Sequence, residues 1–346
     1  MKTAVVILNY NTKDYLRKFL PGLVASCAGL DAQVVVADNA STDGSAALMQ
    51  AEFPDVPLIE LDQNYGFTGG YNRALAQLEA DYYLLINSDI EVPEGWLQPL
   101  VDWMDSHPDC GACGPKLISY AQRDTFEYAG AAGGLVDRYG YPFCRGRILQ
   151  KIEKDHGQYD TPANVLWVSG ACLLVRASVW KTLGGLDERF FCHMEEIDLC
   201  WRMQLHGWKV TVVPQSHVYH IGGGTLPNES PFKLRLNFRN NLLLLENNLP
   251  ATFMAEGLSA QEARKKARRR IFTRMCLDGL SSLNYLITKR WSFYNAVVQA
   301  HKEYRQLRQP GPLPPHPHKP EGLYNGCIIP RAFALFRKKI VYLQDR

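Results

Sequence analysis

The stretch Tyr82-Tyr83-Leu84-Leu85-Ile86-Asn87-Ser88-Asp89-Ile90-Glu91-Val92 decides the fold that this chain is expected to adopt. Residues 82–86 form a short run of bulky apolar side chains, which is typical of a buried β-strand. Polar residues follow at once and end in Asp89. Ligands of open α/β sheets bind at the carboxyl ends of the strands, so this carboxylate is well sited to hold Mg²⁺ or Mn²⁺. The alternative is that Asp89 caps the next helix.

The chain before this stretch alternates between strand and helix patterns. Short apolar runs predict strands over residues 3–8, 33–37 and 58–61. The spacing of apolar side chains predicts helices over residues 14–28, 45–53 and 71–78. Such alternation is typical of an α/β fold with a mostly parallel sheet flanked by helices. Three strand ends carry loops rich in Asn and Asp, which is consistent with one shared rim of the sheet.

Three glycines, Gly66, Gly69 and Gly70, stand just before the third predicted helix. Glycine lets the backbone approach a ligand closely, and a helix N-terminus attracts phosphate. The same residues also suit a loop that only needs positive φ angles. Their spacing matches neither the Rossmann nor the P-loop pattern, so both interpretations stay open.

Carboxylates gather in a second stretch, 184–202, where Glu195, Glu196 and Asp198 follow two phenylalanines. On a helix, Glu195 and Asp198 share one face and Glu196 points about 100° away. Asp198 stands four residues before Arg202, a spacing that favours an ion pair. At least one carboxylate is then free to face a cleft as a general base. The alternative is a solvated helix N-terminus with an acidic first turn.

His220 follows a strand predicted over residues 208–213 and stands just before three consecutive glycines. We expect it on a mobile loop, where a neutral imidazole would complement Asp89 around a divalent cation. A lone His is more often structural. Another strand, predicted over residues 165–175, is interrupted by Gly170, and such a glycine often marks the close approach of a ligand or a backbone.

The net charge of +3 hides an asymmetry between the two ends of the chain. Residues 261–346 hold 18 Lys and Arg against 5 Asp and Glu, a net charge of +13, and the remainder holds 20 against 30, a net charge of −10. Long helices are predicted over residues 232–248, 261–287 and 291–307, followed by a proline-rich linker at 310–320. Basic helices with an apolar face are typical of anionic membrane surfaces, and the alternative is a solvated helical hairpin. No nucleic-acid motif is present, so we do not expect that partner.

The nine cysteines are scattered in apolar surroundings, which favours reduced thiols over disulfides. No apolar run approaches the roughly 18 residues of a membrane span. The first residues resemble a strand more than a signal peptide. We therefore expect a cytoplasmic location, at the inner face of the membrane.

Taken together, these motifs resemble the inverting family 2 glycosyltransferases with the GT-A fold, in the branch of bacterial rhamnosyltransferases and galactofuranosyltransferases. The similarity covers roughly residues 3–225. Its carriers, in order, are residues 5–11, 36–45, 64–72, 84–89, 169–171 and 190–202. The resemblance implies a catalytic domain at 1–225 and a helical, basic C-terminal extension at 226–346, which serves membrane contact or self-association.

The resemblance also implies roles for individual residues. The nucleotide sugar would be bound by Asn9, Asn11, Asp38, Asn64, Gly66, Asn72, Asn87 and Ser88. Asp89 and His220 would hold a divalent cation, Mg²⁺ or Mn²⁺, although Asn87 replaces the first carboxylate of the family's Asp-x-Asp motif. Glu196 would be the catalytic base, with Glu195 as the alternative, because a Glu stands where the family has Asp. Trp167, Gly170 and Ala171 would border the acceptor.

The implied activity is a metal-dependent, inverting transfer of a sugar, with rhamnose as one candidate. The donor would be a nucleoside-diphosphate sugar and the acceptor a hydroxyl of a glycan or lipid-linked molecule, in cell-surface polysaccharide synthesis. Two other functions remain open, a sugar nucleotidyltransferase and a non-catalytic carbohydrate-binding protein. A homo-oligomer is compatible with the sequence.

Overall fold

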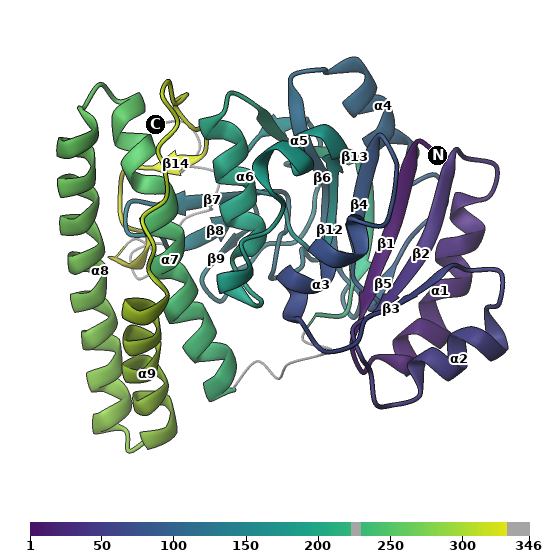
Figure 1. Cartoon of the computed structure of the whole chain (residues 1–346), viewed down its shortest axis with the longest axis horizontal. Coiled ribbons are helices and arrows are strands. Elements are labelled where there is room, and N and C mark those ends of the chain that lie inside the picture. Colours follow the sequence, from purple (N-terminus) through teal and green to yellow (C-terminus); the bar gives the residue numbers. More distant parts are fainter. Residues whose placement is uncertain (223–229, 331–346) are drawn as a thin grey trace.

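A computed structural model describes residues 1–222 and 230–330, and its centre is a large mixed sheet (Figure 1). Its strands are β1 (Thr3–Asn9), β2 (Ala32–Asp38), β3 (Leu58–Glu60), β4 (Tyr82–Ile86), β5 (Ile90–Glu91), β6 (Cys110–Ser119), β11 (Ala163–Asn164), β12 (Cys172–Arg176) and β13 (Lys209–His220). Their order is β11-β13-β6-β12-β4-β1-β2-β3, and β5 pairs with β13. The pairs β3-β2, β2-β1 and β1-β4 are parallel, whereas β12 runs antiparallel to its neighbours.

Helices cover both faces of this sheet. They are α1 (Lys13–Cys27), α2 (Ser45–Glu52), α3 (Gly66–Leu75), α4 (Gln98–Ser106), α5 (Ala177–Leu183), α6 (Glu195–Leu205), α7 (Pro231–Ala255), α8 (Ala260–Ile287) and α9 (Trp291–Leu307). Side chains of α1, α2 and α4 pack in one hydrophobic cluster, and those of α3, α5, α6 and α7 pack in another. The sheet separates these two clusters.

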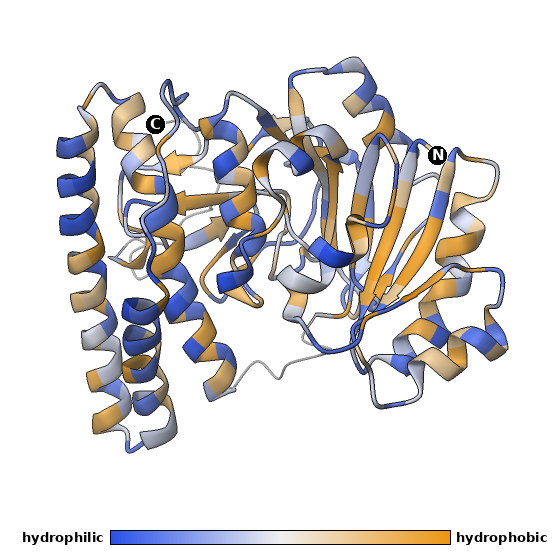
Figure 2. Cartoon of the chain, viewed as in Figure 1, coloured by the Kyte–Doolittle hydropathy of each residue, from blue (hydrophilic) through white to orange (hydrophobic). Residues whose placement is uncertain are grey.

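Strand β1 shows why the central strands of this sheet have uninterrupted apolar sequences. Along β1, Ala4 and Val6 belong to one hydrophobic cluster, and Val5 and Ile7 belong to the other. Successive side chains of a strand point to opposite faces, so a strand covered on both sides needs apolar residues at every position. Figure 2 shows these central strands as the most hydrophobic part of the molecule. The predicted alternation of strands and helices up to residue 86 is confirmed.

Three local predictions differ from the structure. Helix α3 begins at Gly66, so Gly66, Gly69 and Gly70 lie within its first turns and not in a preceding loop. The strand predicted over residues 165–175 is limited to β12, and Gly170 lies in the turn before it. Strand β13 runs on to His220 because it pairs with β6 and β5, so His220 lies at a strand end and not on a loop.

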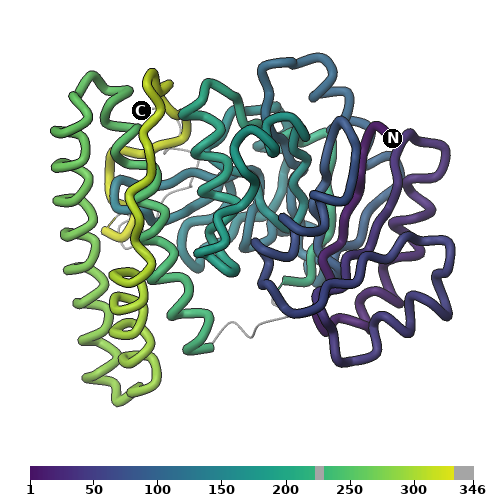
Figure 3. Tube along the Cα trace, viewed as in Figure 1, coloured from purple at the N-terminus to yellow at the C-terminus, as the bar shows by residue number. Residues whose placement is uncertain are grey.

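The region 119–160 contributes to a second, smaller sheet. Its strands are β7 (Gly134–Asp137), β8 (Pro142–Cys144), β9 (Arg147–Ile148), β10 (Lys151–Ile152) and β14 (Leu323–Tyr324), in the order β10-β9-β8-β7-β14. The last strand comes from the C-terminal part, which returns past α7 after α9, as the tube in Figure 3 shows. The predicted linker 310–320 contains no helix or strand.

The C-terminal helices were predicted correctly, and α7 packs on α6 as part of the main core. Leu242–Leu245 of α7 are fully buried in the cluster that also contains Val6 and Leu199. The predicted domain boundary at 225/226 and the basic tail after 330 lie outside the described residues. In the part of the chain that the structure describes, no helix is both long and apolar enough to cross a bilayer. All nine cysteines are free thiols, as predicted.

Candidate active site

The carboxyl ends of β1, β2 and β4 meet in one hydrogen-bonded network. Asn9, fully buried, donates from Nδ2 to Asp38 Oδ1 over 2.7 Å. Thr12 Oγ1 donates to Asn9 Oδ1 over 2.5 Å and lies 2.8 Å from Ser88 Oγ. The structure therefore brings together three of the predicted donor-binding residues, and Thr12, which the sequence analysis did not single out, joins them.

A second set of contacts fixes the loop after β2. Ser41 Oγ accepts hydrogen bonds from Asn9 Nδ2 and from the backbone amide of Asn11, each at 3.0 Å. The Asn11 side chain accepts from the amide of Thr42 at 2.7 Å, and Asn11 itself has φ 54°. Asn and Asp tolerate this left-handed conformation better than most residues, which gives a backbone reason for Asn at this position.

Asn64 and Gly66 are joined to this rim by Asn39, a buried residue that the sequence analysis missed. The Asn39 side chain donates to Asn64 Oδ1 and to the Gly66 carbonyl, both at 3.0 Å. It accepts from the amide of Tyr65 at 3.0 Å. Gly66 has φ +69°, so its predicted need for a positive φ is confirmed.

Asp89 and His220 face one another at the same rim. His220 Nε2 lies 3.2 Å from Asp89 Oδ1 and 3.4 Å from Asn87 Nδ2. On its other side, His220 Nδ1 lies 3.5 Å from Oε2 of Glu127, a buried carboxylate that the sequence analysis missed. Burial lowers the pKa of His220, but the neighbouring carboxylates of Asp89 and Glu127 outweigh this and raise it to about 10.

These residues are compatible with a divalent cation. Two neighbouring ligands of an octahedral ion, each about 2.1 Å from it, lie about 3 Å apart, which is close to the separation of the two donor atoms. A histidine that binds a metal usually donates its second ring N–H to a carboxylate, the position that Glu127 occupies. Among the described residues, however, no group of three or more His, Cys, Asp or Glu side chains forms a closed metal cage. The remaining ligands would come from substrate phosphates or water.

Glu195 and Glu196 begin α6, and the turn at Gly170 packs against the second of them. A Cβ added at Gly170 would lie 3.4 Å from Cβ of Glu196, an ordinary contact with a side chain, so the close approach of a ligand or another backbone stays a prediction. The neighbouring Ala171 accepts a hydrogen bond from the amide of Asn87 over 3.0 Å. The turn 170–171 therefore touches both the end of β4 and the acid pair.

Glu195 is buried and Glu196 is half-buried, and each has one carboxylate oxygen shielded from water. Glu195 Oε2 and Glu196 Oε2 are buried and make no hydrogen bond within the described protein. Burial raises the pKa of Glu196 to about 7, although backbone amides, including that of Gly170, lower it. Burial and the neighbouring Glu196 raise the pKa of Glu195 well above its usual range. A carboxylate with a pKa near neutrality suits a general base at physiological pH.

Two predicted residues are engaged elsewhere in the structure. The Asn72 amide donates to the carbonyl of Leu186 and accepts from its amide, at 2.8 and 3.0 Å. Trp167 is 3% exposed, its ring lies against Gly134, and its N–H donates to the carbonyl of Leu135. Asn72 thus anchors the 186 turn, and Trp167 is held in the core against the 134–135 segment.

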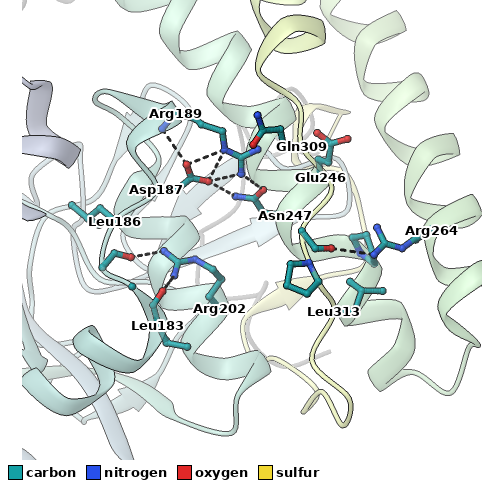
Figure 4. A pocket seen from close by; sticks show the side chains of 15 residues that line it. Leu183, Leu186, Asp187, Arg189, Arg202, Glu246, Asn247, Arg264, Gln309 and Leu313 are labelled. Carbon is teal, nitrogen blue, oxygen red and sulfur yellow. Dashed lines mark hydrogen bonds and ion pairs between the residues drawn. The ribbon is translucent and has the colours of Figure 1, made fainter.

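A cavity of ≈ 380 Å³ lies between the loop before α6, helix α7 and the linker (Figure 4). Within it, Asp187 and Arg189 form a close ion pair, and Asn247 bonds to both of them. Arg202 donates to the carbonyls of Leu183 and Gly185. None of the predicted site residues lines this cavity, so it is separate from the candidate active site.

Comparisons with known proteins agree with this geometry. The sequence profile described as Glycosyl transferase family 2 matches residues 4–183. An N-acetylglucosaminyl-diphospho-decaprenol L-rhamnosyltransferase of Mycobacterium tuberculosis is 30% identical over 234 residues, which cover 62% of this chain and 75% of that protein. Rhamnosyltransferase WbbL of Escherichia coli is 25% identical over 225 residues, 62% of this chain and 82% of that protein.

The fold also matches solved structures. Mannosyltransferase PcManGT from Pyrobaculum calidifontis, in complex with GDP-Man and Mn²⁺, has a TM-score of 0.53 at 15% identity. That match covers 89% of this chain and 88% of the mannosyltransferase. At this identity the similarity shows a shared GT-A fold and no more.

Proposed function

Because the chain belongs to glycosyl transferase family 2, in its rhamnosyltransferase-like branch, we propose that it moves a sugar from a nucleoside-diphosphate donor to a hydroxyl acceptor with inversion. The chain is a glycosyltransferase, and its finer chemistry follows from the site. The single observation that carries the proposal is the placement of Glu196 beside the turn that also contacts the end of β4.

We propose that Glu196 is the general base. Its buried carboxylate, with a pKa near 7, takes the proton of the acceptor hydroxyl as that oxygen attacks the anomeric carbon. The bond from the anomeric carbon to the diphosphate oxygen breaks in the same displacement, so the configuration inverts. Gly170, Ala171 and Trp167 are proposed to border the acceptor.

We propose that Asn9, Asn11, Asp38 and the Asn64–Gly66 segment bind the nucleotide, with Asn87 and Ser88 close to the diphosphate. Asp89 and His220 would hold a divalent cation, which, when bound, stabilises negative charge on the departing diphosphate as a Lewis acid. The Mn²⁺ in the mannosyltransferase complex supports this assignment by analogy of fold. Rhamnose is the first candidate for the donor sugar, because two relatives carry rhamnosyltransferase activity in their names.

We propose that the acceptor is a lipid-linked or glycan molecule and that the C-terminal helices contact an anionic membrane surface at the cytoplasmic face, in cell-surface polysaccharide synthesis. Helix α8 supports the membrane contact. Five large apolar residues near the α8–α9 hairpin are exposed by 48–72%: Phe272, Leu280, Leu283, Ile287 and Trp291. Exposed Lys265, Arg268 and Arg269 precede the first four of these residues on α8, whereas Trp291 begins α9. Figure 2 shows the first turns of α8 mostly blue and its later turns more orange.

The variant Glu196→Gln tests the proposal. It is expected to lower the rate of sugar transfer by about 10²–10⁴-fold, because general base catalysis contributes roughly that factor. Binding of the nucleotide sugar, measured by calorimetry, should be unchanged. The control Glu94→Gln, at an exposed position, should transfer normally. Retained turnover in Glu196→Gln would remove Glu196 from the role of base.

A further inference from the structure

The turn that presents the acid pair has an unusual backbone. Phe191, His193 and Met194 have φ angles of 63°, 72° and 74°, and Phe191 combines its positive φ with ψ −60°. Residues with side chains rarely adopt such conformations, and they persist only where the surrounding structure holds them. Met194 is the N-cap of α6, and no side chain caps the helix at that position. Other contacts must therefore hold this turn in place.

Helix α3 holds the turn from one side. The amide of Thr68 donates to the carbonyl of Phe191 over 3.1 Å. A Cβ on Gly66 would lie 2.5 Å from both that carbonyl oxygen and the Phe191 ring, so only glycine permits this contact. The turn thus contacts Gly66, which lies next to Asn64 and Tyr65 on the rim proposed to bind the donor.

Helix α7 holds the turn from the other side through Asn240. Its side chain is fully buried, and Nδ2 lies within hydrogen-bond distance of the carbonyls of Phe190, Cys192 and His193, at 2.9, 2.8 and 2.8 Å. These three carbonyls span the strained segment. A single amide group therefore fixes the backbone that leads directly into Glu195 and Glu196.

Arg239, the preceding residue of α7, fixes the orientation of that amide. Its Nε donates to Asn240 Oδ1 over 2.9 Å, which leaves the NH₂ group facing the turn. Its Nη2 also donates to the carbonyl of Phe190 over 2.7 Å. Glu303 of α9 lies 3.4 Å from Nη1 of Arg239. A continuous set of contacts therefore joins α9, through α7, to the 190–194 turn.

We propose that Asn240 is a positioning residue for the transfer reaction, which holds the 190–194 turn so that the acid pair meets the acceptor. This inference rests on the proposed role of Glu196. It assigns a part in catalysis to a helix that lies beyond residues 4–183, the part matched by the family profile. A displacement of reacting groups by about 1 Å can lower a rate by about 10²-fold, so loss of this amide should affect kcat more than binding.

The neighbouring residue Asn241 provides a matched control. It is also fully buried on α7, but its amide donates to the carbonyl of Gly140, far from the turn in sequence. Asn240→Ala and Asn241→Ala therefore remove the same group from the same helix, and both should lower the thermal midpoint. Only the first should lower kcat, by about 10–100-fold, with the KM for the nucleotide sugar within about twofold of the parent.

The pH profile adds a readout that a loss of stability alone would not move. Loss of the Asn240 amide loosens the turn and lets water reach Glu196, which lowers the pKa of that carboxyl. The rise of kcat/KM with pH should therefore occur at lower pH in Asn240→Ala and at the parent's pH in Asn241→Ala. Asn240→Ser, which keeps a hydroxyl donor, should recover part of the lost kcat. If Asn240→Ala does not fold, the same comparison is made with Asn240→Ser and Arg239→Lys.

Equal kcat values and equal pH limbs in the Asn240 and Asn241 variants would overturn the inference. Glu196→Gln, measured in parallel, separates this failure from failure of the proposed function. If Glu196→Gln is inactive and Asn240→Ala behaves like Asn241→Ala, only the positioning role is wrong. If Glu196→Gln keeps its activity, the assignment of the base is wrong and the positioning role falls with it.

Discussion

His220 and Asp89 lie 3.2 Å apart between Nε2 and Oδ1, although one ends β13 and the other follows β4. Pairing of β13 with β5 places His220 opposite Ile90, the residue after Asp89. The contact is therefore a consequence of sheet register, and Glu127 on the far side of the imidazole completes a carboxylate–histidine–carboxylate row.

This row predicts that Glu127 tunes the proposed cation site. Glu127→Gln removes the carboxylate that orients the imidazole and should weaken Mn²⁺ binding by about 10–100-fold, the usual effect of losing such an outer partner. Asp89→Ala should abolish specific binding. Titration of the protein with Mn²⁺ followed by electron paramagnetic resonance measures this without substrate. Equal Mn²⁺ affinity in the parent and in Asp89→Ala would exclude this site.

The acid pair predicts the pH dependence of transfer. A base must be deprotonated, and the pKa of Glu196 is about 7, so kcat/KM should rise with pH up to about 7 and level off above it. Glu195→Gln should keep this rise, whereas Glu196→Gln should lose both the rise and most of the rate. The opposite result, with the rise lost only in Glu195→Gln, would make Glu195 the base.

Two glycines predict contrasting effects on stability. A Cβ at Gly134 would lie 1.9 Å from the Trp167 ring, so Gly134→Ala should lower the free energy of unfolding by about 1–3 kcal/mol or more through overpacking. A Cβ at Gly170 meets nothing nearer than 3.4 Å, so Gly170→Ala should change stability little. Thermal and denaturant unfolding of both variants measures the difference. Comparable losses in the two would contradict the tight contact at Gly134.

The exposed apolar residues of α8, which are Phe272, Leu280, Leu283 and Ile287, form a stripe that predicts binding to anionic vesicles. Replacing Phe272, Leu280 and Ile287 together by Ser should remove binding in a flotation assay, because burial of these side chains in the interface drives it. Charge reversal at Lys265 and Arg269 should weaken binding to anionic lipid in a salt-dependent way. Charge reversal at exposed Lys18, on α1, is the control. If the parent does not float with anionic vesicles, the stripe is better assigned to self-association.

Several features could be predicted from the sequence because they depend on local pattern. The apolar run that ends in Asp89 forms β4, and the helix expected over 291–307 is α9 with the same bounds. Periodicity and turn residues carry this information in short windows. The start of α3 was missed because glycine is a poor helix former, and here close packing of Phe191 on Gly66 overrides that preference.

Residues that act through distant partners could not be found in this way. Glu127 and Asn240 stand in no motif, Asn39 lies in the 36–45 motif but had no role assigned to it, and each is defined by contacts with other segments of the chain. The position of His220 was also misjudged, because its strand forms only through pairing with β6 and β5. Long-range pairing leaves no periodic signal in the strand's own sequence.

The sequence by itself determined that polar residues follow buried strands and that an acid pair begins a helix after two phenylalanines. Tertiary structure decided which of these groups meet, and it set their chemistry. Burial in the folded protein raises the pKa of Glu196 to about 7, because desolvation disfavours the charged form, and this outweighs the backbone amides, including that of Gly170, which lower the pKa. That effect depends on the surrounding protein and not on the identity of the residue, so it arises only once the chain has folded.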